Sequence, residues 1–133
     1  KLYTQKSIHE WYKNTKSKFK KSDFYKIYID FPRVELIEKI NLRSKEMIKN
    51  GAVKEVKNFI KLKVRKDKSV NKAIGINEIR QYLNNQKELG EIIEIISIKT
   101  RQYAKRQSTW ARGNMNSWFK LKPNDLNNFL KKI

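Results

Sequence analysis

Positively charged and hydroxyl side chains gather between Thr100 and Arg112, where the sequence reads TRQYAKRQSTWAR. A helix through this segment would carry one stripe of such side chains, at i, i+4, i+7 and i+11, formed by Arg101, Lys105, Ser108 and Arg112. Guanidinium, ammonium and hydroxyl groups in a row donate hydrogen bonds to phosphate oxygens. The stripe therefore predicts a surface that binds a polyanion. A solvated helix face without any partner is the alternative.

The charge of the whole chain agrees with an anionic partner. Its 133 residues include 32 Lys and Arg against 13 Asp and Glu, a formal net charge of +19, and no acidic residue lies between Ile95 and Asn124. Nucleic acid is the usual partner of such a surface, because each cation placed on a phosphate releases a condensed counterion. The chain is also rich in Ile and Asn, as AT-rich coding produces. The clustering of the cations therefore carries more weight than their number.

The elements expected to position this stripe are mainly helices. The long basic helix should begin near Glu88, with Ile92, Ile96 and Tyr103 on the face that docks on a core. Apolar spacing and end signals predict further helices at 7–12, from 32 to a turn at Gly51, at 53–61, around 79–83 and at 123–133. Lys-rich stretches at 13–23 and 61–71 are interpreted as loops, the second of them mobile.

Two strands are expected besides the helices. Aromatic and β-branched residues predict one at 24–31, and a weaker one is expected at 117–121. In the helix at 53–61, Val53, Val56 and Ile60 should lie on one face. Two strands alone do not form a stable sheet in water. We therefore expect a mainly α fold with one or two strands, in which the other strands of a helix-covered sheet lie outside this chain.

The start of the chain bears on its domain organisation. It begins with Lys1 instead of Met, and no internal repeat or long linker divides it. We interpret residues 1–133 as a single structural unit and as a fragment or a trimmed form of a larger protein.

Several kinds of catalytic and metal site are missing from the sequence. Cysteine is absent, and a single histidine, His9, cannot build a zinc site or a catalytic triad and should lie at the surface. The four glycines form no phosphate-binding loop. The acidic residues near the predicted strand and the helix after it are interpreted as structural or solvated: Asp23, Asp30, Glu35, Glu38 and Glu46. We predict neither a catalytic residue nor a metal ligand in this chain.

An apolar turn around Gly75, from Lys72 to Asn77, has two interpretations. Glycine could simply make the turn before the next helix. Its missing side chain could instead let the backbone from Ala73 to Ile76 approach a ligand closely, with the charge of Lys72 beside it. Both interpretations stay open at this point.

Three blocks of sequence have an order and spacing that resemble a known family. They are Arg43-x-x-x-Met47-x-x-x-Gly51-x-x-x-Glu55-Val56, Lys72-Ala-Ile-Gly-x-x-Glu78-x-x-x-Tyr82-Leu83 and Thr100-Arg-Gln-Tyr-Ala-Lys-Arg-Gln-x-Thr-Trp-x-Arg112. Together they resemble the C-terminal part of bacterial tRNA dimethylallyltransferase, the isopentenyl-tRNA transferase family. The third block is the most specific. A further match at Thr4-x-Lys6-Ser7-Ile8 extends the resemblance to nearly the whole chain.

The resemblance implies a three-layer, P-loop-type α/β enzyme whose parallel sheet lies mostly outside this chain. Such an enzyme uses Mg²⁺ and transfers a dimethylallyl group from dimethylallyl diphosphate to N6 of the adenosine next to the anticodon. The adenosine must leave its stack, since a stacked exocyclic amine cannot reach the allylic carbon. The phosphate loop, the diphosphate-binding residues, the magnesium site and the catalytic base would all precede Lys1. This fragment alone is therefore expected to be inactive.

The resemblance also assigns tRNA contacts to the two segments singled out above. They comprise Lys72, Ala73, Ile74, Gly75, Ile76 and Asn77, then Lys105, Arg106, Gln107, Ser108, Thr109, Trp110, Ala111 and Arg112, with Arg101 as a further phosphate contact. The cations would contact phosphates and base edges, and Gln107 and Thr109 would make polar contacts. Trp110 would be buried and fix the turn, or alternatively stack on a base.

Two positions depart from the pattern of the family. Ile76 and Asn77 stand where many relatives have Tyr and a basic residue, so contact there should be weaker or made by neighbours. Gln5 stands where Gly is common, which affects the expected local turn.

The expected partners are the tRNA anticodon stem-loop and dimethylallyl diphosphate. We expect a monomer in the cytoplasm of a bacterium, with no membrane contact, because no run approaches the ~18–20 apolar residues of a membrane span. A stand-alone basic RNA-binding helical module without catalysis stays open as an alternative. So does a helical interaction domain whose charge is incidental.

Overall fold

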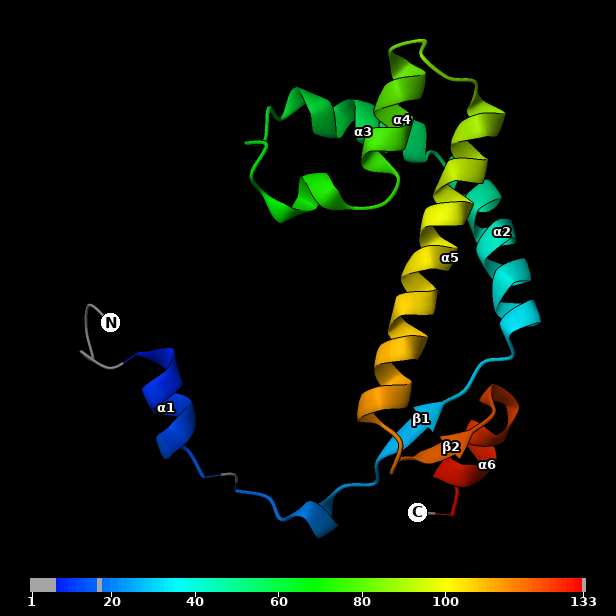
Figure 1. Cartoon of the computed structure of the whole chain (residues 1–133). Helices are drawn as coiled ribbons and strands as arrows, with labels where there is room; N and C mark the ends of the chain where they lie inside the picture. Colours follow the sequence, from blue (N-terminus) through cyan, green and yellow to red (C-terminus); the bar gives the residue numbers. More distant parts are fainter. Residues whose placement is uncertain (1–6, 17, 133) are drawn as a thin grey trace.

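The computed structural model describes residues 7–16 and 18–132 (Figure 1). Thr4, Gln5 and Lys6, which the family resemblance also involves, lie outside the described residues. The helices are α1 (Ile8–Asn14), α2 (Arg33–Lys49), α3 (Ala52–Lys61), α4 (Ile76–Leu83), α5 (Leu89–Asn114) and α6 (Leu126–Leu130). The strands are β1 (Ile27–Ile29) and β2 (Phe119–Leu121), and 3₁₀ helices occupy Lys21–Asp23, Ser69–Lys72 and Pro123–Asp125. The fold is therefore mainly helical with two strands, as the sequence predicts.

Helix α5 organises the structure, and the other elements lie at different levels along it (Figure 1). Helix α2 packs against α5, and α3 and α4 pack together beside its N-terminal half. The strand pair lies near its C-terminal end. The 26-residue helix thus connects a small core at one end with the strands at the other.

The core lies where α3, α4 and α5 meet. Its buried residues are Ala52, Val56, Ile79, Ile92 and Ile96. Ile79 and Ile92 are the largest fully buried side chains, and burying such a side chain contributes about 1.5–3 kcal/mol. The placement of Ile92 and Ile96 on the docking face of α5 is confirmed.

Burial varies along the apolar faces of α3 and α5, and the placement of Tyr103 on the docking face requires a correction. Ile60 is 39% exposed, and Phe59 is the half-buried residue of that turn. Tyr103 is 50% exposed, because the described core contacts only the N-terminal half of α5 and ends before that position. Helical spacing gave the direction of these side chains, and the extent of the neighbouring elements decides their burial.

Several helix ends follow directly from local sequence. The Ser7 side chain accepts from the Glu10 backbone N–H at 3.2 Å and caps the helix predicted at 7–12. Gly51 has φ +100° after the end of α2, and its N–H donates to the Ile48 carbonyl at 3.2 Å. The predicted left-handed glycine at this position is therefore confirmed.

Strands β1 and β2 pair in parallel, with Ile27 opposite Phe119 and Ile29 opposite Leu121. The strand predicted at 24–31 shrinks to three residues, because the ladder extends only as far as its partner and Pro123 soon follows β2. The terminal helix predicted at 123–133 divides into a 3₁₀ turn and α6. Ile133 lies outside the described residues.

The segment predicted as a loop at 61–71 contains folded turns. Asn71 is buried, and its Nδ2 donates to the Arg65 carbonyl at 2.8 Å. The Arg80 guanidinium in turn donates to the Asn71 Oδ1 at 3.2 Å. These bonds fix the chain just before the turn at Gly75.

Candidate nucleic-acid interface

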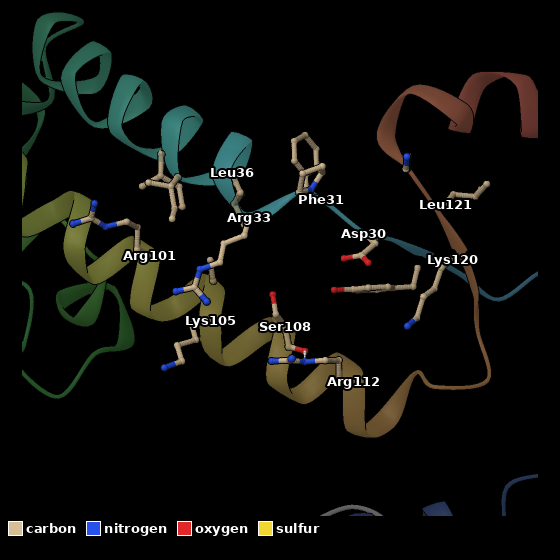
Figure 2. A pocket seen from close by; sticks show the side chains of 16 residues that line it. Asp30, Phe31, Arg33, Leu36, Arg101, Lys105, Ser108, Arg112, Lys120 and Leu121 are labelled. Atoms are coloured by element: carbon tan, nitrogen blue, oxygen red, sulfur yellow. Dashed lines mark hydrogen bonds between the residues drawn. The ribbon is translucent and has the colours of Figure 1, made fainter.

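The predicted stripe on α5 lines a cavity of about 630 Å³ between α5, the start of α2 and the strand pair (Figure 2). Arg101, Lys105, Ser108 and Arg112 all lie on its wall, so the prediction that they share one face is confirmed. Helix α2 and the strands close over this face. The stripe therefore faces a concave surface instead of an open helix side.

Further cations join the stripe from other elements. Arg33 comes from the first turn of α2, and Lys120 and Lys122 come from β2 and the residue after it. Figure 2 shows Arg33 reaching toward α5 and Lys120 on the strand side. With Arg101, Lys105 and Arg112, the cavity carries six cationic side chains and one acid, Asp30.

This excess of positive charge is not neutralised within the described part of the chain. None of the six cations forms an ion pair there. The Arg112 Nε donates at 3.4 Å to the Ser108 carbonyl of its own helix, which leaves the charge unpaired. Like charges gathered in a hollow with apolar walls raise the local concentration of anions. The cavity is thus suited to a phosphate-bearing ligand.

The other side chains of the 105–112 segment turn away from this cavity. Arg106, Gln107 and Trp110 line a second hollow, of about 610 Å³, together with Ala111, Met115 and Trp118. The walls of this hollow are largely apolar and aromatic. Ser108 reaches both hollows. The segment is therefore divided between a cationic surface and an aromatic one.

Polar groups in the segment already have partners of their own. The Thr109 hydroxyl donates to the Lys105 carbonyl at 3.0 Å, so only its lone pairs are available to a ligand. The Arg106 guanidinium lies 5.8 Å from the centre of the Tyr103 ring. Such a cation–π contact orients the guanidinium and keeps its charge.

Trp110 requires a correction. The interpretation that it is buried and fixes the turn is wrong, since its side chain is 58% exposed. The physical reason is its position on the side of α5 that the described elements leave uncovered. Stacking on a base stays a prediction.

The Lys72–Asn77 segment forms a separate surface, and it lines neither hollow. Gly75 is buried with φ +108°, while Lys72, Ala73, Ile74 and Asn77 are exposed and Ile76 is half-buried. A Cβ added at Gly75 would meet Met47 Cε at an ordinary 3.7 Å. The unusual φ is thus the reason for glycine in the turn. A close approach of ligand to its backbone stays a prediction.

The carboxylate of Glu78 holds this turn in place. Its Oε2 accepts from the Gly75 N–H at 2.7 Å, and its Oε1 accepts from Lys99 Nζ at 2.5 Å. Burial raises the pKa of Glu78. The hydrogen bonds from Lys99 and from the backbone N–H groups of Glu78 and Gly75, with the charge of Lys99, outweigh burial and lower the pKa overall.

Sequence reasoning missed three cavity residues: Arg33, Lys120 and Lys122. None of them belongs to a periodic pattern. The packing of α2 against α5 brings Arg33 to the hollow, and the parallel pairing of β1 and β2 brings Lys120 and Lys122 there. The sequence does carry a signal for Glu78, because a Glu three residues after a turn glycine marks the start of a helix.

Among the described residues, neither a metal-binding cluster nor a membrane-spanning helix occurs. No three side chains of His, Cys, Asp or Glu gather there as a metal site would require. No helix in residues 7–16 and 18–132 is long and apolar enough to cross a membrane. The exposed positions of His9, Glu35, Glu38 and Glu46 agree with their interpretation as surface residues.

The structure combines a long helix, a short parallel strand pair and a cation-lined hollow. Comparisons with known proteins identify the class to which a chain with these features belongs. The chain belongs to the IPP transferase family, whose sequence model matches residues 2–114. It is homologous to tRNA dimethylallyltransferase. The protein of that name from Pelagibacter ubique (strain HTCC1062) is 56% identical over 133 residues, which cover 100% of this chain and 42% of that protein.

Solved structures carry the same fold. The tRNA delta(2)-isopentenylpyrophosphate transferase of Staphylococcus epidermidis matches 83% of this chain with a TM-score of 0.70 and 25% identity, over 38% of its own length. The tRNA isopentenylpyrophosphate transferase of Bacillus halodurans matches 93% of this chain with a TM-score of 0.68 and 30% identity, over 42% of its length. The chain thus spans less than half the length of these relatives, and the mainly helical fold matches part of them.

Proposed function

We propose that this chain is the C-terminal, tRNA-contacting portion of a tRNA dimethylallyltransferase, folded as one structural unit. The observation that carries the proposal is the hollow beside α5, whose six cations include the predicted stripe and have no ion-pair partner among the described residues. The names of the relatives indicate which polyanion binds, because each name includes tRNA. The substrate would be the anticodon stem-loop of tRNA, which contains the adenosine next to the anticodon.

In this proposal the two surfaces of the 105–112 segment have different roles. Lys105 and Arg112, with Arg101, contact phosphates from the cationic hollow. On the aromatic side, Arg106 contacts a further phosphate and Gln107 a base edge, and the half-exposed Trp110 offers a stacking surface. The turn at Lys72–Asn77 makes the remaining contact.

The chemistry itself would depend on residues outside this chain. The described residues do not fit a magnesium site, because no cluster of three possible ligands occurs among them. We therefore assign the Mg²⁺, the diphosphate site and the catalytic base that the family implies to the remainder of the enzyme. The part of the enzyme represented by this chain positions the RNA. In isolation it would transfer no dimethylallyl group.

The test is tRNA binding by a variant with Lys105→Ala and Arg106→Ala. Both affinity and its dependence on salt should fall, because two phosphate-neutralising charges are lost. Unchanged affinity and salt dependence would contradict the proposal. Binding without prenyl transfer by the protein that contains this chain would indicate a stand-alone RNA-binding module instead.

A further inference from the structure

Glu78 joins the two segments that we propose to contact tRNA. It lies in the first turn of α4 and is only 4% exposed. One carboxylate oxygen accepts from the Gly75 N–H in the turn, and the other accepts from Lys99 on α5. A single buried side chain thus bridges the turn and the long helix.

The position of Lys99 gives this bridge its significance. Lys99 lies six residues before Lys105, about 9 Å along the axis of α5. The α4 N-terminus meets α5 at this level, so the turn lies beside the helix just before the stripe (Figure 1). The Glu78–Lys99 contact therefore joins the turn to α5 just before the stripe.

Other polar contacts of the turn do not reach α5. Asn71 bonds to Arg65, Lys68, Asn77 and Arg80, all within the segment from 65 to 80. Among the described residues, the Glu78–Lys99 bond is the one polar side-chain contact between α4 and α5. Apolar packing alone permits small shifts of one helix along another, whereas an ion pair with defined donors and acceptors fixes direction and distance.

We propose that Glu78 is a positioning residue for tRNA recognition. Its carboxylate holds the Lys72–Asn77 turn at a fixed place relative to the Lys105–Arg112 segment, so that both contact the same RNA. The inference rests on the proposed function, since it requires the two segments to bind tRNA. It adds a residue that touches no RNA and acts through Gly75 and Lys99.

The informative variant is Glu78→Gln in the full-length enzyme. The carboxamide oxygen can still accept from the Gly75 N–H, while the charge that holds Lys99 is lost. Half-exposed Lys99 then turns to water, so the fold loses little. A matched control is Glu91→Gln, because Glu91 also accepts from a backbone N–H three residues before it, Glu88 at 2.9 Å, and pairs with Lys87 at 3.6 Å. That pair lies at the exposed start of α5, within one segment of the chain.

The experiment is a double-mutant cycle that combines Glu78→Gln with Lys72→Ala or with Lys105→Ala and measures tRNA affinity. Glu78→Gln should weaken binding about fivefold and raise the KM for tRNA with kcat nearly unchanged. The penalty of Lys72→Ala should largely disappear in the Glu78→Gln background, because a displaced turn no longer offers that contact. The penalty of Lys105→Ala should persist, and Glu91→Gln should behave like the parent enzyme.

Each other outcome has a defined meaning. Additive penalties for Glu78→Gln and Lys72→Ala, or no effect of Lys72→Ala while Lys105→Ala weakens binding, would overturn the positioning role and leave the proposed function in place. No effect of either lysine change would contradict the proposed function itself. If Glu78→Gln fails to fold, Lys99→Arg and Lys99→Gln replace it. With arginine at position 99, Lys72→Ala should still weaken tRNA binding as in the parent enzyme. With glutamine there, the penalty of Lys72→Ala should largely disappear, and equal penalties in both backgrounds would overturn the inference.

Discussion

The double change Lys105→Ala and Arg106→Ala gives the sharpest prediction about RNA binding. Both side chains are exposed, and neither has an acidic partner among the described residues. Lys105 lies on the cationic hollow and Arg106 on the aromatic one, so two different phosphates are available to them. Each contact to single-stranded nucleic acid contributes roughly 0.7 to the slope of log K against log salt, and to a duplex roughly 0.9.

The magnitude follows from these values. Two lost contacts lower the slope by roughly 1.4–1.8, so raising salt from about 50 to about 200 mM should reduce affinity about tenfold less in the variant than in the parent. The assay is an equilibrium tRNA titration at several salt concentrations. The matched control is Lys45→Ala with Lys49→Ala. These substitutions remove the same amount of charge, but from exposed positions on α2 that line neither hollow. Equal slopes for the two double variants would refute the assignment of phosphate contacts.

Two further predictions concern stability. Gly75→Ala should destabilise the protein by about 1–3 kcal/mol, because φ +108° strains any other residue although space for a Cβ exists. Gly90→Ala in α5 should instead stabilise the protein by up to about 1 kcal/mol. Denaturant unfolding measures both changes, and equal effects would contradict a strained turn at Gly75. The lowered pKa of Glu78 means that its stabilising contribution is present above the unfolded value near 4.5 and is lost as pH falls through the folded value. Lys99→Met removes the hydrogen bond and the charge that oppose the effect of burial on the Glu78 carboxylate. The pKa of Glu78 should therefore rise, and acid unfolding should begin at higher pH. An unchanged acid transition would show that Lys99 does not hold the carboxylate.

Local sequence predicts the helices and the main stripe well, for a physical reason. The spacing of Arg101, Lys105 and Arg112 fixes their common side once a helix forms, and Gly51 has a backbone requirement that its neighbours reveal. Such features depend on a few residues in one segment. They are therefore visible before any tertiary contact is known.

Features that depend on distant elements were not predictable in this way. Arg33 belongs to the cationic hollow because α2 packs against α5, and Lys120 because β1 and β2 pair in parallel, and no local pattern indicates either contact. Tyr103 and Trp110 point as helical spacing requires, yet they remain exposed because the described elements do not cover that part of α5. The sequence reveals the direction of a side chain, and the neighbouring elements determine its environment.

The central claim is that the cationic face of α5 contacts tRNA, and lysine footprinting tests it most directly. The protein is labelled at its lysines with and without the anticodon stem-loop, and the modification of each residue is compared by mass spectrometry. Protection of Lys105 and Lys120, with Lys45 and Lys49 labelled equally in both samples, is the predicted result. Labelling of Lys105 and Lys120 that stays the same when tRNA is bound would contradict the claim.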